Sequence, residues 1–375
     1  MNFRNVKIDE YLKLKLFFEA YFGDNFFEVE PKHFYWMHND NPLKKYVAND
    51  DEFTAFAAFD NSSIVSCLLY YPVDFIVDGK NYRSCFTTGL LADKQYTAAG
   101  GFLLKKHFDR TNYHLSLGDT QVTMKILTKQ FGFEYNHNIG RSIMIGSASD
   151  TISLLLQKKD LTVDNFKEIY QWEDMTLTSA QKASYVEITS IDALRDHYWN
   201  YHKKACRATV SRDKTFMKWR YFDHPHIKYD IISPDSSQQK GIAVIRLERI
   251  RGSNMKVARM LECLHADDDH DALCCSVAKY LIDKKAVFLD FFCGSRSYLD
   301  RSLRSPFLLE KDHSRFPFPR LFQPLEWRER HSLNATFGKV KNKQCPSVCL
   351  DEVYFTKGEG AQDVFVNEEY FTRGF

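Results

Sequence analysis

Apolar runs and short polar turns follow one another in the same order in two parts of the chain. Between residues 55 and 93, three apolar stretches are separated by the turn sequences DNSS and VDGKN. Between residues 230 and 268, three more are separated by PDSSQQKG and IRGSN. Apolar stretches of this length between such turns predict the strands of an antiparallel meander.

The same order continues beyond each meander. A stretch whose apolar residues recur with helical spacing comes next, at 100–110 and at 271–285. A fifth strand follows, at 113–119 and at 287–295. Each part then ends in another helical segment and a last pair of strands, so the two parts predict the same fold.

Two matching motifs indicate that the chain is an internal duplication. WMHNDNPLKKY, from Trp36, and WRYFDHPHIKY, from Trp219, both fit W-x(5)-P-x(3)-Y, with their anchors 183 positions apart. The predicted class is α/β (α+β), with two tandem domains, each a mostly antiparallel mixed sheet flanked by helices. The expected boundaries are 1–160 for the first domain, 161–184 for a charged linker and 185–375 for the second domain.

A loop in the first copy is the candidate anion site. The stretch QYTAAGGFLLKK, residues 95–106, places two adjacent glycines just before an apolar helix. One interpretation is a flexible turn. The other is a loop whose bare backbone N–H groups, with the helix N-terminus, bind an anion such as a phosphate.

This order of strand, small-residue loop, helix, strand and helix resembles the GNAT superfamily of acyl-CoA-dependent N-acyltransferases. The family motif Q/R-x-x-G-x-G/A is met from Gln95 to Gly100, with Ala98 in place of the first glycine. MKILTKQFGF, residues 124–133, is similar to the family's late helix, which normally ends Y-x-x-x-G-F. The resemblance implies the family's fold, an acyl-CoA co-substrate and N-acyltransferase activity.

The resemblance also implies which residues meet acyl-CoA. Backbone N–H groups of the loop would hold the pyrophosphate, and the backbone of the fourth strand would pair with the pantetheine. Gln121 and Lys125 stand where the family often touches CoA, with a solvated helix face as the alternative. The expected cofactor-binding residues are Leu90, Leu91, Gln95, Thr97, Ala98, Ala99, Gly100, Gly101, Gln121 and Lys125.

The implied reaction is direct attack of an amine on the thioester, and three residues are expected to be catalytic. The backbone N–H near Leu90 would polarise the carbonyl group. Asp119 is the candidate base for the amine proton, with a helix N-cap as the alternative, and His107 and His114 are weaker candidates. Thr128 stands where the family has the tyrosine that protonates the departing thiolate, although threonine is a far weaker acid.

The second copy carries ADDDHDAL, residues 266–273, where the phosphate loop should be. Its carboxylates would repel a pyrophosphate, so this half is not expected to bind CoA. A polar helix cap explains these acids more simply than a metal site, and no metal is expected.

The second copy is then free to hold the acceptor. An aromatic side chain can stack on a base, and an arginine can bind a diphosphate through two hydrogen bonds. Trp219 has a repeat mate at Trp36 and is better explained as a core residue. The expected substrate-binding residues are Arg220, Tyr221, Ser295 and Arg296.

The layout resembles tandem GNAT sugar N-acyltransferases of bacterial surface-polysaccharide biosynthesis, which act on dTDP- or UDP-linked amino sugars. The stretch from Tyr354, which is polar and contains glycine, resembles the tails of that group and is predicted to be too irregular for a core strand. Two alternatives stay open. One is a protein or peptide N-acyltransferase, or an aminoacyl-transfer enzyme, on a duplicated GNAT fold, and the other is a binding protein without activity.

Charge and composition narrow the partners. With 51 Lys and Arg against 49 Asp and Glu, the net charge is +2, which argues against a nucleic-acid partner. No run reaches membrane-spanning length, and the nine cysteines, most of them in apolar runs, are typical of a reducing compartment. We expect a cytoplasmic protein with no membrane contact, and a monomer because duplication already supplies a dimer-like interface.

Overall fold

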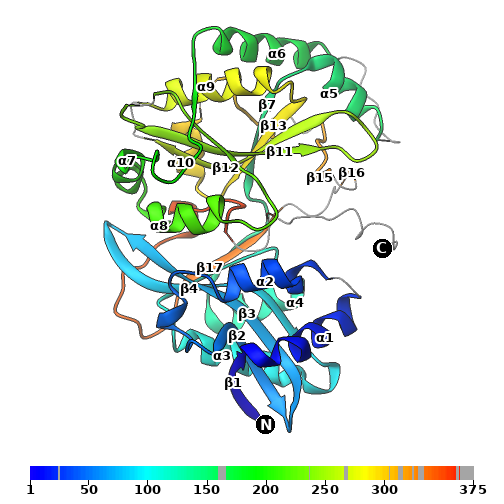
Figure 1. Ribbon diagram of the computed structural model, residues 1–375, viewed down its shortest axis with the longest axis vertical. Helices are drawn as coiled ribbons and strands as arrows, with labels where there is room; N and C mark the ends of the chain where they lie inside the picture. Colours follow the sequence, from blue (N-terminus) through cyan, green and yellow to red (C-terminus); the bar gives the residue numbers. More distant parts are fainter. Residues whose placement is uncertain are drawn as a thin grey trace.

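The computed structural model contains two large β-sheets stacked along the long axis of the molecule (Figure 1). The early part of the chain, blue to cyan, builds most of the lower sheet, and the later part, green to yellow, most of the upper one. The predicted class, two mostly antiparallel mixed sheets flanked by helices, is confirmed. The structure describes residues 1–23, 26–158, 166–235, 237–265, 269–303, 305–310, 316–322, 325–327, 333–359 and 363.

The first sheet begins as the antiparallel meander that the sequence predicts. Its VDGK turn has positive φ at Asp78 and Gly79, as a two-residue hairpin turn requires. In spatial order the strands are β1 (Asn2–Lys7), β2 (Glu52–Asp60), β3 (Ser63–Val77), β4 (Lys80–Ala92), β5 (Tyr113–Leu117), β17 (Ala335–Lys339) and β6 (Glu134–Asn136), while β9 (Ala208–Val210) pairs with β3 and β18 (Val353–Tyr354) with β9.

The second sheet repeats this arrangement. In both sheets the meander is antiparallel and its last strand pairs in parallel with the strand that follows the crossover helix. In spatial order the strands are β8 (Val186–Glu187), β10 (Asp230–Ser233), β11 (Gly241–Arg249), β12 (Lys256–His265), β13 (Phe288–Cys293), β7 (Gly140–Ile145) and β14 (Leu308–Leu309), and β15 (Leu321–Phe322) forms a separate hairpin with β16 (Leu325–Glu326).

The two halves of the chain exchange strands. β7, from the first half, joins the second sheet, while β9, β17 and β18, from the second half, join the first sheet. β7 pairs antiparallel with β13 of the second sheet, and β17 pairs antiparallel with β5 and β6 of the first. In Figure 1 β7 is the teal strand above and β17 the orange strand below. For these strands, the half of the chain does not determine the sheet, because an apolar pattern does not specify which sheet edge a strand joins.

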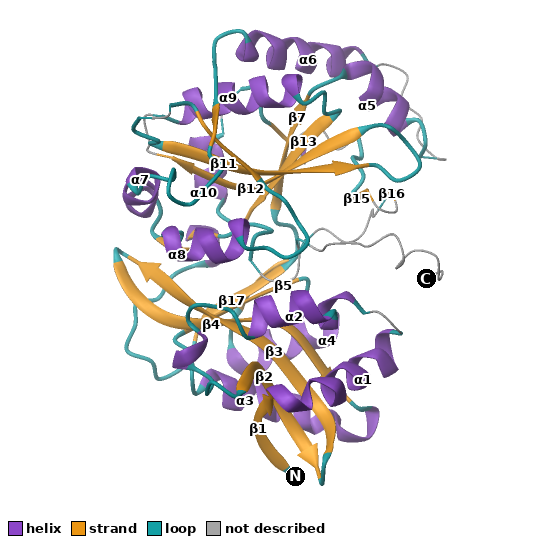
Figure 2. Cartoon of the chain, in the orientation of Figure 1, coloured by secondary structure: helices purple, strands orange, loops and turns teal. Residues whose placement is uncertain are grey.

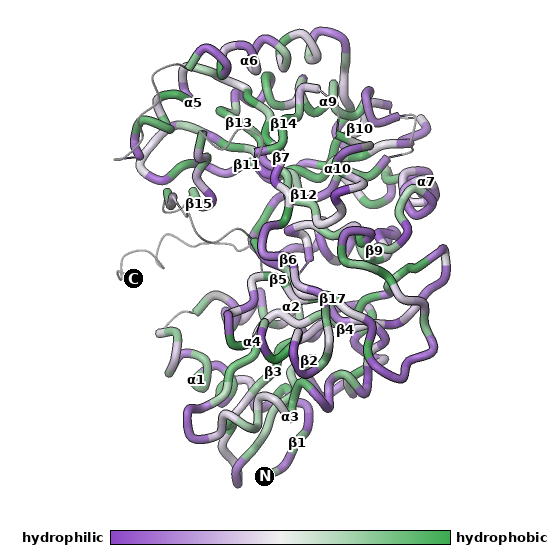
Figure 3. Tube along the Cα trace, turned by 180° about the vertical axis from the view of Figure 1, so that it is seen from behind, coloured by the Kyte–Doolittle hydropathy of each residue, from purple (hydrophilic) through white to green (hydrophobic). Residues whose placement is uncertain are grey.

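Helices cover both faces of each sheet (Figure 2). Hydrophobic residues concentrate along the strands and polar ones along the outer helix surfaces and loops (Figure 3). Residues 167–180 of the expected linker form α6, which packs against α9. One face of the first sheet is covered by α1 (Tyr11–Phe22) and α2 (Pro31–His38), and the other by α3 (Thr97–Phe108) and α4 (Gln121–Ile126). The outer face of the second sheet is covered by α5 (Ala148–Leu155), α6 (Lys167–Ala180) and α9 (His270–Asp283). Its other face, toward the first sheet, is covered by α7 (His197–Ala205), α8 (Lys214–Met217) and α10 (Arg296–Ser302).

The two repeat motifs meet at a pseudo-twofold contact. The indole N–H of Trp36 donates to the carbonyl of Trp219 at 2.8 Å, and that of Trp219 donates to the carbonyl of Trp36 at 3.0 Å. The two rings stack with centroids 5.3 Å apart. Such a reciprocal contact is what equivalent residues of a duplicated unit make across a twofold axis, so the duplication and the core role of Trp219 are confirmed.

Candidate functional site

The fourth and fifth strands of the first sheet separate at a β-bulge. Leu69 faces Gly89 and Tyr70 faces Thr87, so Thr88 is the extra residue of β4. The parallel pairing of β4 with β5 is recorded only at Thr87 and Ser116. Beyond this point, residues 88–92 of β4 pair with β3 alone within the described part of the chain. The bulge thus creates a free strand edge at Leu90 and Leu91, as the resemblance to the GNAT superfamily implies.

The free edge is partly buried and carries one buried polar group without a hydrogen-bond partner among the described residues. Leu90 and Leu91 are intermediate in exposure, with Leu90 packed on the α3 side of the sheet and Leu91 on the α1 side. The hydroxyl oxygen of Thr88 is buried and makes no hydrogen bond among the described residues. A buried polar edge without partners is costly unless a ligand satisfies it, so the edge fits an amide-containing chain.

The loop singled out from the sequence leads directly into α3. A 3₁₀ turn, Lys94–Tyr96, ends where α3 begins at Thr97, and the N-cap residue Tyr96 offers no side-chain acceptor to the first turn. Gln95, Thr97 and Ala98 are exposed. The N-terminal N–H groups of α3 are therefore without a side-chain cap.

The two glycines have different structural roles. A β-carbon at Gly100 would stand 3.5 Å from that of Ala92, so Gly100 and the buried Ala99 let α3 lie close to β4. A β-carbon at Gly101 would meet nothing within 4 Å. The absence of a side chain thus allows close packing of α3 on β4 at Gly100, and leaves open space beside the backbone at Gly101.

Asp119 lies at the junction of β5 and the exchanged strand β17. Its carboxylate accepts hydrogen bonds from the hydroxyls of Ser116 at 2.6 Å and Thr336 at 2.5 Å. Burial raises the pKa of Asp119, and these two hydroxyls oppose the shift. The N-cap of α4 is Thr120, which accepts from the N–H of Thr123, so the alternative interpretation of Asp119 as the cap is wrong.

The remaining candidates in the first half differ in accessibility. Thr128 donates its hydroxyl to the carbonyl of Met124 at 2.9 Å, while Gln121 and Lys125 are exposed on the same helix. His107 and His114 are buried in the core, and burial lowers the pKa of His107 to about 3 and that of His114 well below its usual range. Burial therefore favours the neutral form of both histidines.

The second half has the same bulge and the same separation of strands. Leu261 is the extra residue of β12, because Val244 faces Glu262 and Ile245 faces Met260. Parallel pairing with β13 ends at Met260, directly before the bulge, as it does in the first half. Cys263, two residues past the bulge, therefore corresponds to Leu90 of the first half.

The chain itself occupies the free edge of the second half. The N–H of Cys263 donates to the hydroxyl of Tyr354 at 3.1 Å, and the hydroxyl of Tyr298 donates to its carbonyl. On the opposite side, Thr356 bridges Cys293 of β13. The segment from Tyr354 to Thr356 thus contacts the end of β12 through the Tyr354 side chain and the end of β13 through its backbone, at the place where the first half leaves its strand edge unpaired.

This segment corrects the prediction for the C-terminal stretch. Tyr354 belongs to the buried strand β18 and Thr356 forms a β-bridge, so the expectation that the stretch from Tyr354 is too irregular for a core strand is wrong at these residues. Residues 360–362 and 364–375 lie outside the described residues. Polarity misled the prediction because side chains of the second half satisfy the polar groups of the segment.

We expect Gly294→Ala to destabilise the second half by about 3 kcal/mol or more. A β-carbon at Gly294 would lie 1.8 Å from the ring of Phe355, whose carbonyl accepts from the Gly294 N–H at 2.9 Å. Chemical denaturation of the variant measures the loss. Gly101→Ala is the matched control, and equal stability of the two variants would contradict the close approach.

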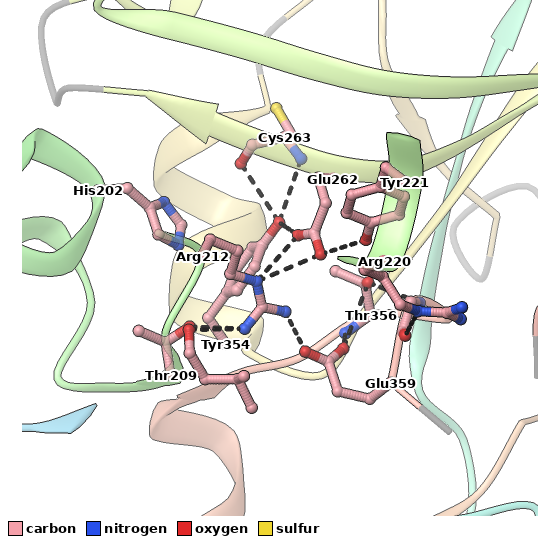
Figure 4. A network of polar contacts seen from close by, with 12 residues as sticks. His202, Thr209, Arg212, Arg220, Tyr221, Glu262, Cys263, Tyr354, Thr356 and Glu359 are labelled. Atoms are coloured by element: carbon pink, nitrogen blue, oxygen red, sulfur yellow. Dashed lines mark hydrogen bonds and ion pairs between the residues drawn. The ribbon is translucent and has the colours of Figure 1, made fainter. Parts of the chain in front are cut away.

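A buried cluster of charges fixes the inserted segment (Figure 4). Arg212 is 0% exposed and forms ion pairs with Glu262 of β12 and Glu359 of the segment. Glu262 also accepts from the hydroxyls of Tyr221 at 2.6 Å and Tyr354 at 3.0 Å. Burial raises the pKa of Glu262 to about 7, against the lowering effect of Arg212.

The four predicted acceptor residues lie in different environments. Arg220 is 3% exposed, donates to the carbonyl of Gly358 at 2.8 Å and lies 5.1 Å from the centre of the Trp36 ring. Tyr221 belongs to the charge cluster. Ser295 caps α10, and Arg296 is exposed and pairs with Asp300. The structure does not bring these residues together into one described site, and their acceptor role stays a prediction.

The acidic loop of the second half is described only in part. Residues 266–268 lie outside the described residues, while Asp269 precedes α9 and Asp271 pairs with His270. Within the described residues no group of three or more His, Cys, Asp or Glu is arranged to hold a metal ion. All nine cysteines are free. None of the described helices is both long and apolar enough to cross a bilayer.

The fold is similar to those of solved N-acyltransferases. A GCN5-related N-acetyltransferase from Anabaena variabilis aligns with 91% of this chain and 73% of its own, at 7% identity and a TM-score of 0.55. A protein from Enterococcus faecalis described as a probable N-acyltransferase covers 91% and 72%, at 9% identity and 0.54. Saccharomyces cerevisiae N-myristoyltransferase with bound myristoyl-CoA covers 93% and 80%, at 10% identity and 0.51.

These similarities show the fold alone: this chain folds like these solved N-acyltransferases. No protein-family model matches the sequence, and no curated protein matches it. The activity must therefore be argued from the residues of this chain.

Proposed function

We propose that the protein transfers an acyl group from acyl-CoA to a primary amine, with the donor held by the first half alone. One observation carries the proposal: two equivalent strand separations differ in what lies in them. In the first half, residues 88–92 have no partner strand on the β5 side within the described residues, whereas in the second half Tyr354 and Thr356 fill the equivalent place. The likeness to N-acyltransferases supports the same conclusion.

The residues of the first half fit acyl-CoA. The uncapped N-terminus of α3 would hold the pyrophosphate through the N–H groups of residues 97–101, with Gln95 beside them. The free edge at Leu90 and Leu91 would pair with the pantetheine amides and place an N–H near the thioester carbonyl. Gln121 and Lys125, both exposed, are proposed as outer contacts with CoA. The bound donor supplies the activated acyl carbon.

The leaving thiolate needs no acid from Thr128. The hydroxyl of Thr128 is donated to its own helix, at the carbonyl of Met124. Because a thiolate is a good leaving group, we propose that it takes its proton from water, and that Thr128 is a structural residue at the family's tyrosine position.

For the acceptor we propose a dTDP- or UDP-linked amino sugar, as the resemblance of the sequence implies. Of the four predicted acceptor residues, Arg296 is the exposed one. Arg220 and Tyr221 are buried and would act from the region where the two halves meet. A protein or peptide amine is the second candidate, which the likeness to N-myristoyltransferase favours. The monomeric state and the cytoplasmic location stay predictions.

An assay of thiol release tests the activity. We expect acetyl-CoA to lose its acyl group in the presence of an acceptor amine, with candidates chosen from dTDP- and UDP-linked amino sugars, glucosamine and a peptide with a free amino terminus. Mass spectrometry should find the acylated amine. Separate titrations with dTDP and UDP test the nucleotide part of the acceptor. CoA binding without transfer to any of these amines would contradict the proposed activity.

A further inference from the structure

A carboxylate from outside the loop at residues 95–101 lies against the bulge of β4. Glu28 is on the 3₁₀ turn Phe27–Val29 that joins α1 to α2. One of its carboxylate oxygens lies 3.1 Å from the position that a β-carbon on Gly89 would occupy. Gly89 follows the bulge residue Thr88 directly, so the carboxylate stands where the free edge of the strand begins. Only glycine at this position leaves that much room beside the backbone.

The turn that carries Glu28 is fixed at three points. Val29 is 0% exposed, and its carbonyl accepts from the hydroxyl of Tyr11 on α1 at 2.6 Å. Glu30 caps α2 by accepting from the N–H of His33 at 2.7 Å. The same carboxylate contacts His226 of the second half at 2.7 Å. The two halves together therefore hold the position of Glu28.

Glu28 lies on the face of the first sheet opposite to α3. Gly89 and Leu91 face α1 and α2, whereas Leu90 and Ala92 face α3. In the proposed complex the phosphates lie at α3, so the acceptor amine approaches from the other face. Asp119, by contrast, is bonded to Ser116 and Thr336 near β17, on the side of the sheet where His114 packs with Phe133.

We propose that Glu28, rather than Asp119, is the general base of the first half. This inference rests on the proposed function. As the amine nitrogen bonds to the acyl carbon, an N–H proton passes to the carboxylate of Glu28. The carbon–sulfur bond then breaks, the thiolate takes a proton from water, and Glu28 returns its proton to solvent, so atoms and charge balance.

The electrostatic surroundings suit this role. Burial raises the pKa of Glu28 to about 7, from an ordinary value of 4.5, and no charged neighbour contributes to the shift. The neighbouring elements bring Glu19 and Tyr11 from α1, Glu30 and His33 from the start of α2, and His226 from the second half. A base is most effective when its pKa lies near the working pH, and Glu28 is still partly exposed to a substrate.

The test uses the full chain with acetyl-CoA as donor and, as acceptor, whichever amine the wild type acylates. Glu28→Gln keeps the shape of the side chain and removes the base, and Glu28→Asp keeps the carboxylate on a shorter arm. We expect Glu28→Gln to lower kcat about 10²- to 10⁴-fold, with the CoA dissociation constant unchanged within about twofold. Glu19→Gln, which removes the Glu19 carboxylate paired with Lys15 on α1, should behave as the wild type.

The pH profile separates a base from a merely structural residue. Wild-type kcat/KM should rise with pH up to about 7 and then level off. Glu28→Gln should lose this pH-dependent rise, which is the acidic limb of the profile. Glu28→Asp should keep part of the activity and show the limb at a shifted pH. A glutamine variant with unchanged kcat, or with the same limb, would overturn the inference while leaving the acyltransferase intact. A wild type that binds no CoA or acylates no amine would instead remove the proposed function.

The stability of the protein gives a readout without substrate. The raised pKa means that the folded state favours protonated Glu28, a contribution present below about 4.5 and lost as the pH rises through about 7. The wild type should therefore lose more stability across this window than Glu28→Gln does. Equal pH dependence of unfolding in the two proteins would contradict the burial of this carboxylate.

Discussion

Ala98→Glu is expected to weaken CoA binding by roughly 10- to 100-fold without destabilising the protein. Ala98 is exposed in the first turn of α3, so a longer side chain meets no core. A carboxylate there would repel the pyrophosphate by about 1 to 4 kcal/mol over a few ångströms, depending on the solvent exposure of the pair. A carboxylate near a helix N-terminus favours the helix, which protects the fold.

The matched control is Ala98→Gln, which adds nearly the same volume without the charge. We expect it to keep CoA affinity within about threefold, and calorimetric titration of all three proteins measures the difference. Equal losses in the two variants would mean that volume and not charge acts at this position. No loss in either would mean that the phosphates lie elsewhere.

Arg212→Leu is expected to destabilise the protein by about 3 to 5 kcal/mol. Arg212 is buried between Glu262 and Glu359, and its removal would leave two carboxylates without a counter-ion in the core. The inserted segment from Tyr354 would then lose its main anchor. Denaturant unfolding and the thermal midpoint measure the loss.

Arg296→Leu supplies the comparison. Arg296 is 46% exposed and pairs with Asp300 one helical turn away, a contact worth about 0 to 1 kcal/mol. A large difference between the two arginine variants is expected. Similar stability of the two would mean that the buried cluster does not hold the segment in place.

The repeat could be predicted from the sequence because its evidence is local. The tryptophan motifs, the meander turns and the crossover helices are all read from residues close together in the chain, and the Trp36 and Trp219 contact confirms them. The exchange of β7 and β17 could not be predicted in this way. Both are short strands, and nothing in their sequence pattern identifies the partner strand.

The site was predictable where it depends on the backbone and less so where it depends on long-range packing. The free edge at Leu90 is what the resemblance to the GNAT superfamily implies, whereas Glu28 is 61 positions before Gly89 and belongs to no motif. Gly89 was the available signal, since a glycine inside a strand indicates a bulge or a close approach. Tyr354 was misjudged because its polar neighbours find their partners only in the folded protein.

Calorimetric titration of CoA into the full chain tests the central claim most directly. The account predicts saturable binding with one CoA per chain, since the first half leaves its strand edge free and the second half fills the equivalent place with residues 354–356. Two CoA molecules per chain, or none, would contradict it.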